Sequence, residues 1–212
     1  MAPRVLIFTA DLGEGHDLPA RVIAEGILAR EPEAEVQVVD VLEAAGPFVR
    51  NAVRSACERS VGPWWRVYEI EYALNVGWGP AAAVQSRIGA AIATPGVSRA
   101  VQLFDPDVIV TTYPGANPIL TWARDRGRIR QVPIVSAISD LSALRYWAHP
   151  GVDVHLVIHE ESREEVLRFA GTDTEVIHVR GITRAVFDEP CDRLEARRLL
   201  DLPEDGGIVA VS

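Results

Sequence analysis

The residues with the clearest chemical potential lie between positions 11 and 20, directly after an apolar run. Gly13 and Gly15 let the backbone approach a ligand closely, and the helix predicted to follow directs its first N–H groups into the same space. His16 stands at that helix start, where the positive end of the helix dipole favours a neutral imidazole. A neutral imidazole that faces a crevice accepts protons, so we expect His16 to act as a general base.

A dinucleotide-binding fingerprint is the alternative interpretation of this loop. Gly13 and Gly15 match the first two glycines of the pattern GxGxxG, but Leu18 stands where the third glycine is required for packing. Asp40, at the end of the next predicted strand, is placed like the acid that binds ribose in nucleotide-cofactor proteins. The incomplete spacing disfavours this interpretation.

A second group of candidate residues lies between positions 138 and 150, again after a predicted strand. This loop combines aromatic side chains, among them Trp147, with Arg145 and His149, which suits a ligand with a polar head and an apolar body. The alternative is that Trp147 belongs to the core and that His149 only precedes a proline. The loop 111–118, rich in Pro and Gly, is interpreted as a turn by default. Because it also follows a predicted strand, ligand contact by this loop is the alternative.

The stretch 47–65 is locally basic in an acidic chain. It contains Arg50, Arg54 and Arg59 against one acidic residue, and it ends in Trp64 and Trp65. Arginine and tryptophan beside apolar residues are typical of a helix that lies on an anionic bilayer surface. An amphipathic helix packed on the sheet is the alternative.

Alternating strand and helix patterns surround these candidates and predict a Rossmann-like parallel sheet of about six strands. Glu35–Leu42 is predicted as the second strand, and residues 47–93 are predicted to be helical. The last five residues, 208–212, look like a buried strand that starts another domain, and an ordinary edge strand of the same sheet is the alternative. The other predicted strands span 5–10, 107–111, 133–138, 152–158 and 175–180, and the other predicted helices span 16–30, 97–104, 117–126, 160–170 and 192–200.

Composition excludes several classes of function. The chain has 212 residues and a net charge of −9, which disfavours nucleic-acid binding. All 21 basic residues are Arg, so Schiff-base chemistry and a P-loop lysine are excluded. His155 and His159 lack an obvious third metal ligand, and the two cysteines form no CxxC motif, so we expect no metal site and no cofactor. No apolar stretch of about 18 residues is present, and we expect a soluble or peripheral cytoplasmic protein.

Motifs spread over most of the chain resemble one known family. The run Leu6–Asp11 followed by Gly13-Glu14-Gly15-His16 resembles the opening strand and His-containing loop of the monogalactosyldiacylglycerol synthase and processive diacylglycerol glucosyltransferase family, related to MurG-type glycosyltransferases. The loops Ser139-Asp140-Leu141 and Trp147–Pro150 are similar to two further family motifs. The segments 181–190 and 195–203 resemble the family's interdomain linker.

The resemblance implies a GT-B fold in which an N-terminal domain binds the acceptor and a C-terminal domain binds the sugar nucleotide. It implies inverting transfer of a hexose from a UDP-sugar to diacylglycerol without a bound metal, at the inner face of the cell membrane. His16 would act on the acceptor hydroxyl, and the stretch 47–65 would meet an anionic membrane. The residues expected to bind substrate are Asp11, Gly13, Gly15, Asp140, Trp147 and His149.

The implied domains are an acceptor-binding domain at 1–182, a linker at 183–207 and the first strand of a donor-binding domain, absent here, at 208–212. We therefore expect the chain alone to be inactive. Two alternatives stay open: a non-catalytic lipid- or partner-binding module of the same fold, and a nucleotide-cofactor-binding Rossmann domain.

Overall fold

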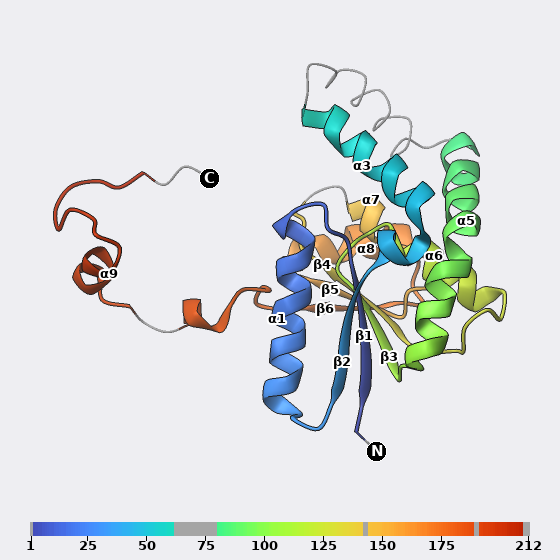
Figure 1. The fold of residues 1–212 in the computed structure, drawn as a ribbon, viewed down its shortest axis with the longest axis horizontal. Helices are drawn as coiled ribbons and strands as arrows, with labels where there is room; N and C mark the ends of the chain where they lie inside the picture. Colours follow the sequence, from blue (N-terminus) through green and yellow to red (C-terminus); the bar gives the residue numbers. More distant parts are fainter. Residues whose placement is uncertain (1, 62–79, 142–143, 189–190, 210–212) are drawn as a thin grey trace. The chain divides into compact units, whose positions relative to one another are not determined.

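The computed structural model describes residues 2–61, 80–141, 144–188 and 191–209 and divides the chain into two compact units, Met1–Ile182 and Thr183–Ser212. The first unit contains a parallel sheet in the strand order β2-β1-β3-β4-β5-β6 (Figure 1). This confirms the predicted Rossmann-like class. The strands are β1 (Arg4–Thr9), β2 (Glu35–Asp40), β3 (Val108–Thr111), β4 (Ile134–Ile138), β5 (Val154–Val157) and β6 (Glu175–His178).

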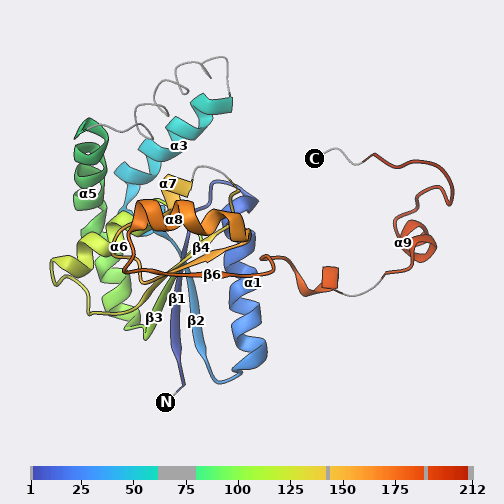
Figure 2. The ribbon, with the colours of Figure 1, turned by 180° about the vertical axis from the view of Figure 1, so that it is seen from behind.

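Helices connect successive strands, as a parallel sheet requires (Figure 2). A short 3₁₀ turn, η1 (Glu160–Ser162), precedes α8, and η2 (Ala185–Asp188) follows the sheet in the second unit. The helices of the first unit are α1 (Glu14–Arg30), α2 (Val41–Ala45), α3 (Pro47–Val61), α5 (Pro80–Phe104), α6 (Ala116–Asp125), α7 (Leu144–Trp147) and α8 (Arg163–Ala170).

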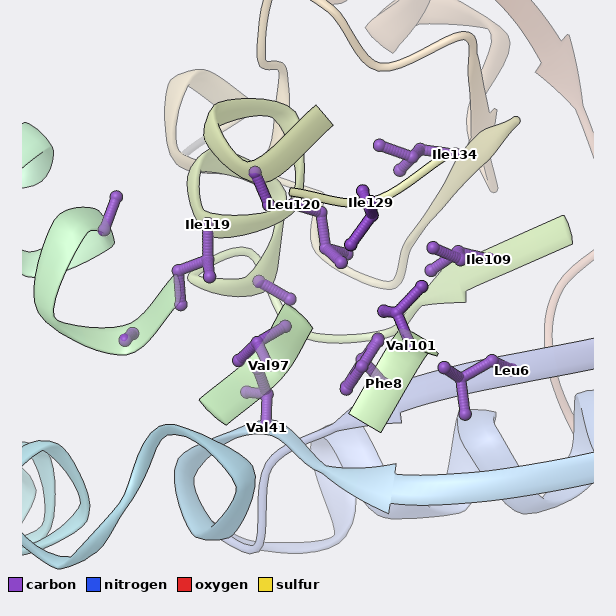
Figure 3. Packing of buried hydrophobic residues seen from close by; sticks show 14 of the residues in the cluster. Leu6, Phe8, Val41, Val97, Val101, Ile109, Ile119, Leu120, Ile129 and Ile134 are labelled. Carbon is purple, nitrogen blue, oxygen red and sulfur yellow. The ribbon is translucent and has the colours of Figure 1, made fainter. Parts of the chain in front are cut away.

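Side chains of β1 alternate between two apolar layers, because neighbouring residues of a strand point to opposite faces. Leu6 and Phe8 pack with α2, α5 and α6 in the larger core cluster (Figure 3). Val5 and Ile7 pack on the other face, against α1. Burial on both faces explains why β1 is a nearly continuous apolar run in the sequence.

The strand order reverses beside β1. The chain passes from β1 outward to β2 and then returns to the other side of β1 to form β3. In open parallel sheets, such a reversal separates the loops at the carboxyl ends of the two inner strands and leaves a crevice for ligands. The loop that carries His16 follows β1 at this reversal. The carboxyl edge faces the top in Figure 1, where α3 and α7 are labelled.

Most predicted bounds differ by a few residues from the observed ones, and two of the differences are informative. The second strand ends at Asp40 and not at Leu42, because the Asp40 carboxylate accepts hydrogen bonds from the N–H groups of Leu42 and Glu43 and so starts α2. The helices predicted around 47–93 and 97–104 do not break before Val97, since α5 runs from Pro80 to Phe104 with Pro95 inside it.

The second unit contains η2 and α9 (Arg193–Leu199). Asp192 caps α9 by accepting hydrogen bonds from the N–H groups of Leu194 and Glu195. The buried Arg197 donates to the carbonyl oxygens of Pro203, Glu204 and Gly206, which folds the following turn onto the helix. Ile208 and Val209 have no regular secondary structure and 210–212 lie outside the described residues, so the terminal strand stays a prediction.

Candidate active site at the carboxyl edge of the sheet

Gly13 sets the turn between β1 and α1. Its φ of +118° lies in the region that disfavours side chains, although a Cβ at this position would meet no atom within 4 Å. Backbone conformation, and not space, therefore requires the glycine. Gly15 lies inside the first turn of α1, exposed and with open space around it. The two predicted glycines thus differ in role, and only Gly13 is required by the turn.

His16 lies in the first turn of α1 and reaches across the strand-order reversal to the end of β3. Its Nδ1 is 2.9 Å from the carbonyl oxygen of Thr112, the residue that follows β3. A carbonyl only accepts hydrogen bonds, so Nδ1 must carry the ring proton and donate it. In the neutral ring Nε2 then carries the lone pair, and none of the described residues forms a hydrogen bond to it. A half-exposed imidazole with this tautomer can accept a proton from a ligand.

Two aromatic rings flank the imidazole. The centroid of the Tyr113 ring lies 5.1 Å from that of His16 in an edge-on arrangement, and the centroid of the Trp147 ring lies 6.0 Å away. Tyr113 comes from the loop after β3, and Trp147 ends α7 after β4. Segments that follow three different strands therefore meet at His16.

Trp147 is both a core residue and a neighbour of the site. It is only 1% exposed and packs with Ile138, Leu144 and Val157. Its indole N–H donates to the Asp140 carboxylate over 2.7 Å. Trp147 therefore belongs to the core, as one of the two alternatives has it, and one Asp140 oxygen serves to orient the indole. Substrate binding by Trp147 and Asp140 stays a prediction. The loop approaches α1 as well, because the Ser139 hydroxyl lies 3.4 Å from the carbonyl oxygen of Gly15.

Asp11 connects the His16 loop to neighbouring helices. Its carboxylate forms an ion pair of 3.0 Å with Arg54 of α3, and its backbone N–H donates to Asp40. Asp40 uses its other oxygen to cap α2. Asp11 is therefore an anchor of the loop, and ligand binding by this residue stays a prediction.

Asp40, the acidic residue on which the nucleotide-cofactor interpretation depends, is hydrogen-bonded to the backbone in this structure. Asp40 lines a surface groove of about 390 Å³ together with Val39, Ala100 and Phe104. Both of its carboxylate oxygens are occupied by backbone N–H groups, Oδ1 at the start of α2 and Oδ2 at Asp11. These three hydrogen bonds tie the carboxylate to the backbone and disfavour its use in binding a ribose.

His149 makes its hydrogen bonds with α6, with its own loop and with β5. Its Nδ1 lies 2.6 Å from the carbonyl oxygen of Pro150 and 3.4 Å from the Thr121 hydroxyl. Its backbone N–H donates to Nε2 of the fully buried His155. Burial lowers the pKa of His149, which keeps the ring neutral at physiological pH. These contacts are structural, and substrate binding by His149 stays a prediction.

Of the residues predicted to contact a membrane, Arg50 and Arg54 lie in the described part of α3. Arg50 forms an ion pair of 2.9 Å with Glu43, and Arg54 pairs with Asp11, so both cations are partly neutralised within the chain. Arg59 lies in α3, but its side chain is outside the described residues, as are Trp64 and Trp65. Val49 and Val53 of α3 pack against the core, whereas Phe48 is 74% exposed. The helix therefore has a packed face and one large apolar side chain in solvent.

The part of the chain that the structure describes holds no cluster of three metal-ligating side chains. His155 donates from Nδ1 to the Thr174 hydroxyl inside the core, and His178 lies 3.9 Å from the Glu160 carboxylate. No helix within the described ranges is long and apolar enough to cross a bilayer.

Sequence reasoning missed three residues that build the site: Thr112, Tyr113 and Asn117. The loop 111–118 was interpreted as an ordinary turn. The available signal was the pair Thr111-Thr112 at the end of a buried strand, followed by a buried Asn in the next helix. Polar residues at such positions need partners, and in a parallel sheet those partners lie at the carboxyl edge.

The doubly wound parallel sheet, with its strand order reversed beside β1, defines a Rossmann-like domain. The sequence profile of the monogalactosyldiacylglycerol (MGDG) synthase family matches residues 16–183, well over half of the chain. The chain therefore belongs to the monogalactosyldiacylglycerol synthase family, which confirms the resemblance found in the motifs.

A similar curated protein is the processive diacylglycerol beta-glucosyltransferase of Bacillus subtilis (strain 168). It is 26% identical over 190 residues, which cover 88% of this chain and 47% of the relative. The chain thus spans about half the length of the curated relative that it matches.

Proposed function

We propose that the chain is the acceptor-binding half of an inverting glycosyltransferase that moves a hexose from a UDP-sugar to diacylglycerol. The observation that carries the proposal is His16, whose Nδ1–H is donated to Thr112 at the strand-order reversal while Nε2 keeps its lone pair. Membership of the family and the likeness to a diacylglycerol glucosyltransferase support the class of reaction.

The proposed step is a single displacement. As the acceptor hydroxyl oxygen forms a bond to the anomeric carbon, the bond from that carbon to the diphosphate oxygen breaks and UDP leaves with the electron pair. Nε2 of His16 takes the hydroxyl proton. Attack from the face opposite the leaving group inverts the anomeric centre. The carbonyl of Thr112 steadies the imidazolium that forms, because it already accepts the Nδ1 proton.

The domain division belongs to the same proposal. Residues 1–182 bind the acceptor, 183–207 form a linker, and 208–212 begin a donor-binding domain. Contacts that stabilise charge on the leaving diphosphate are an essential part of such a reaction. We assign them to that second domain, so purified residues 1–212 are expected to transfer no hexose from a UDP-sugar.

The decisive test is a His16→Ala substitution in a protein that carries both halves. Loss of a general base is expected to lower turnover at least about 100-fold, measured as sugar transfer to diacylglycerol in mixed micelles. His178→Ala is the matched control, since His178 is exposed and pairs only with Glu160 among the described residues. Unchanged turnover in His16→Ala would refute the assignment.

Membrane contact through α3 is proposed on the exposed Phe48 and on the scarcity of acidic residues in α3 and α5. A diacylglycerol acceptor stays in the bilayer, so the edge that holds His16 must meet it. The Arg54–Asp11 ion pair joins α3 to the His16 loop, which puts helix and loop at one edge. Phe48 would then enter the interface with the arginines beside it.

Co-sedimentation with vesicles tests this contact. Phe48→Ser is expected to weaken binding to phosphatidylcholine–phosphatidylglycerol vesicles about 30-fold, because a Phe side chain gains about 2 kcal/mol on burial. Leu103→Ser is the control: Leu103 is 77% exposed, but it lies beside Phe104, which contacts Arg4 at the opposite edge of the sheet. Equal effects of the two substitutions, or equal binding to purely neutral vesicles, would contradict the proposed surface.

A further inference from the structure

Asn117, the second residue of α6, is completely buried beneath the candidate site. Its Oδ1 accepts a hydrogen bond of 2.6 Å from the Thr111 hydroxyl. Its Nδ2 donates to the Ser136 hydroxyl over 3.0 Å and to the carbonyl oxygen of Trp147 over 2.8 Å. Both amide N–H groups are used, so this side chain connects β3, β4 and α7 with no donor to spare.

The orientation of this amide is fixed by chemistry. The carbonyl of Trp147 can only accept, so the NH₂ group must face it and Oδ1 must face Thr111. No other short side chain offers two donors and an acceptor in one plane. An aspartate of the same shape would place an oxygen against the Trp147 carbonyl and leave that carbonyl without a donor.

The partners of Asn117 are the immediate neighbours of the groups that touch His16. Thr111 precedes Thr112, whose carbonyl accepts the Nδ1 proton of His16. Trp147 is held through its own carbonyl while its ring lies 6.0 Å from the imidazole. One buried amide therefore fixes two of the three contacts that define where the imidazole lies.

We infer that Asn117 is a positioning residue for His16, acting through the Thr112 carbonyl and the Trp147 ring. The inference deepens the proposed function and rests on it, because the position of His16 matters for catalysis only if His16 is the base. It adds a residue that touches neither acceptor nor donor. Small displacements of a general base reduce turnover strongly, since proton transfer requires close alignment.

The test uses Asn117→Asp and a readout that needs no substrate. In the 212-residue chain, NMR is expected to show the His16 Nδ1–H resonance and nuclear Overhauser contacts from the His16 ring to Trp147 and Tyr113. Asn117→Asp is expected to lose the Nδ1–H resonance and the contact to Trp147. In a protein that carries both halves, kcat is expected to fall about 10-fold while KM for the UDP-sugar changes less than about 2-fold.

Thr94→Val is the control for a general loss of stability. Thr94 is 5% exposed and donates to the carbonyl oxygen of Ala90 within α5, so it loses one buried hydrogen bond remote from Asn117. It is expected to leave the His16 resonances and kcat unchanged. A folded Asn117→Asp variant with unchanged His16 contacts overturns the inference, and so does an equal change in Thr94→Val.

A second variant covers the case in which Asn117→Asp does not fold. Thr111→Val keeps the shape of the strand end and removes only the bond to Oδ1. It is expected to weaken the His16 Nδ1–H resonance and to preserve the Trp147 contact; an unchanged resonance overturns the inference. A different result would show that His16 is not the general base. In that case His16→Ala would keep its turnover, whatever NMR contacts Asn117→Asp shows.

Discussion

His16 and His155 occupy two regions that treat the same side chain in opposite ways. His155 is fully buried in β5: its Nε2 accepts the backbone N–H of His149, and its Nδ1 donates to Thr174 over 2.9 Å. His16 is half-exposed at the β1–β3 reversal and uses only Nδ1, towards Thr112, among the described residues. Both rings carry their proton on Nδ1.

The two rings differ at Nε2, and this nitrogen decides what each histidine can do. At His155 both ring nitrogens form hydrogen bonds within the fold. A protonated ring would no longer offer Nε2 as the acceptor for the backbone N–H of His149. At His16 the fold fixes one nitrogen and leaves the other to a ligand. We therefore expect the same substitution to have different effects at His16 and at His155.

The largest expected difference is in stability. His155→Ala should lower the free energy of unfolding by about 4 kcal/mol, because it opens a cavity, orphans the His149 N–H and removes the hydrogen bond that the Thr174 hydroxyl accepts. His16→Ala should lower it by less than about 1 kcal/mol, since the ring is half-exposed. Urea denaturation followed by circular dichroism measures both. Equal losses would show that His16 is also a structural residue.

Acid should destabilise the His155 region next. Burial, together with the nearby His149, lowers the pKa of His155 from 6.5 to about 4. As pH falls from 6.5 towards 4, the unfolded chain therefore binds a proton that the folded chain refuses, and stability is lost over that window. The shift corresponds to a loss on the order of 3 kcal/mol at pH 4.

His155→Gln isolates this contribution, because it removes the titrating group and keeps an acceptor for the His149 N–H. Its free energy of unfolding should fall less steeply than that of the unsubstituted chain between pH 6.5 and pH 4. Parallel curves for the two proteins would assign the acid loss to other groups.

The alternation of strands and helices made most of the fold predictable. The apolar run at β1 and the glycine loop located His16 at a strand end. The bounds of β2 were missed because Asp40 suits a strand end and a helix cap equally, and only its bonds to Leu42 and Glu43 decide. The predicted helices 47–93 and 97–104 were separated before Val97, but α5 is continuous from Pro80 to Phe104 and contains Pro95.

The candidate site was predictable only in part. The position of His16 followed from the local pattern, whereas its partners Thr112, Tyr113 and Trp147 come from two other strand ends. Such contacts depend on strand order, which no local pattern encodes. The ion pair between Arg54 of α3 and Asp11, 43 residues earlier, was missed for the same reason, since it too joins segments that are distant in the sequence. Membrane contact by the arginines of α3 stays a prediction.

Gly96 and Gly89 of α5 differ in the space around them. A Cβ on Gly96 would lie 1.9 Å from the carbonyl oxygen of Ala44, where α5 crosses α2. Backbone cannot yield locally, so Gly96→Ala should cost about 2 kcal/mol and lower the thermal midpoint. Gly89→Ala, in the same helix with open space, should leave stability equal or slightly higher. Similar midpoints for both variants would contradict the close helix crossing.

Gly115 gives the smallest effect on stability and the most local one. A Cβ there would lie 2.5 Å from Cε1 of the Tyr113 ring, but its φ of −65° suits alanine. Tyr113 is half-exposed and its ring can move, so Gly115→Ala should change the free energy of unfolding by less than about 1 kcal/mol. The ring must leave its edge-on contact with His16, 5.1 Å between centroids. NMR should therefore show loss of the contact between the two rings in a protein of nearly unchanged stability. A Gly115→Ala variant that keeps this contact would mean that the glycine does not set the Tyr113 ring, and Tyr113 would no longer count among the groups that define the site.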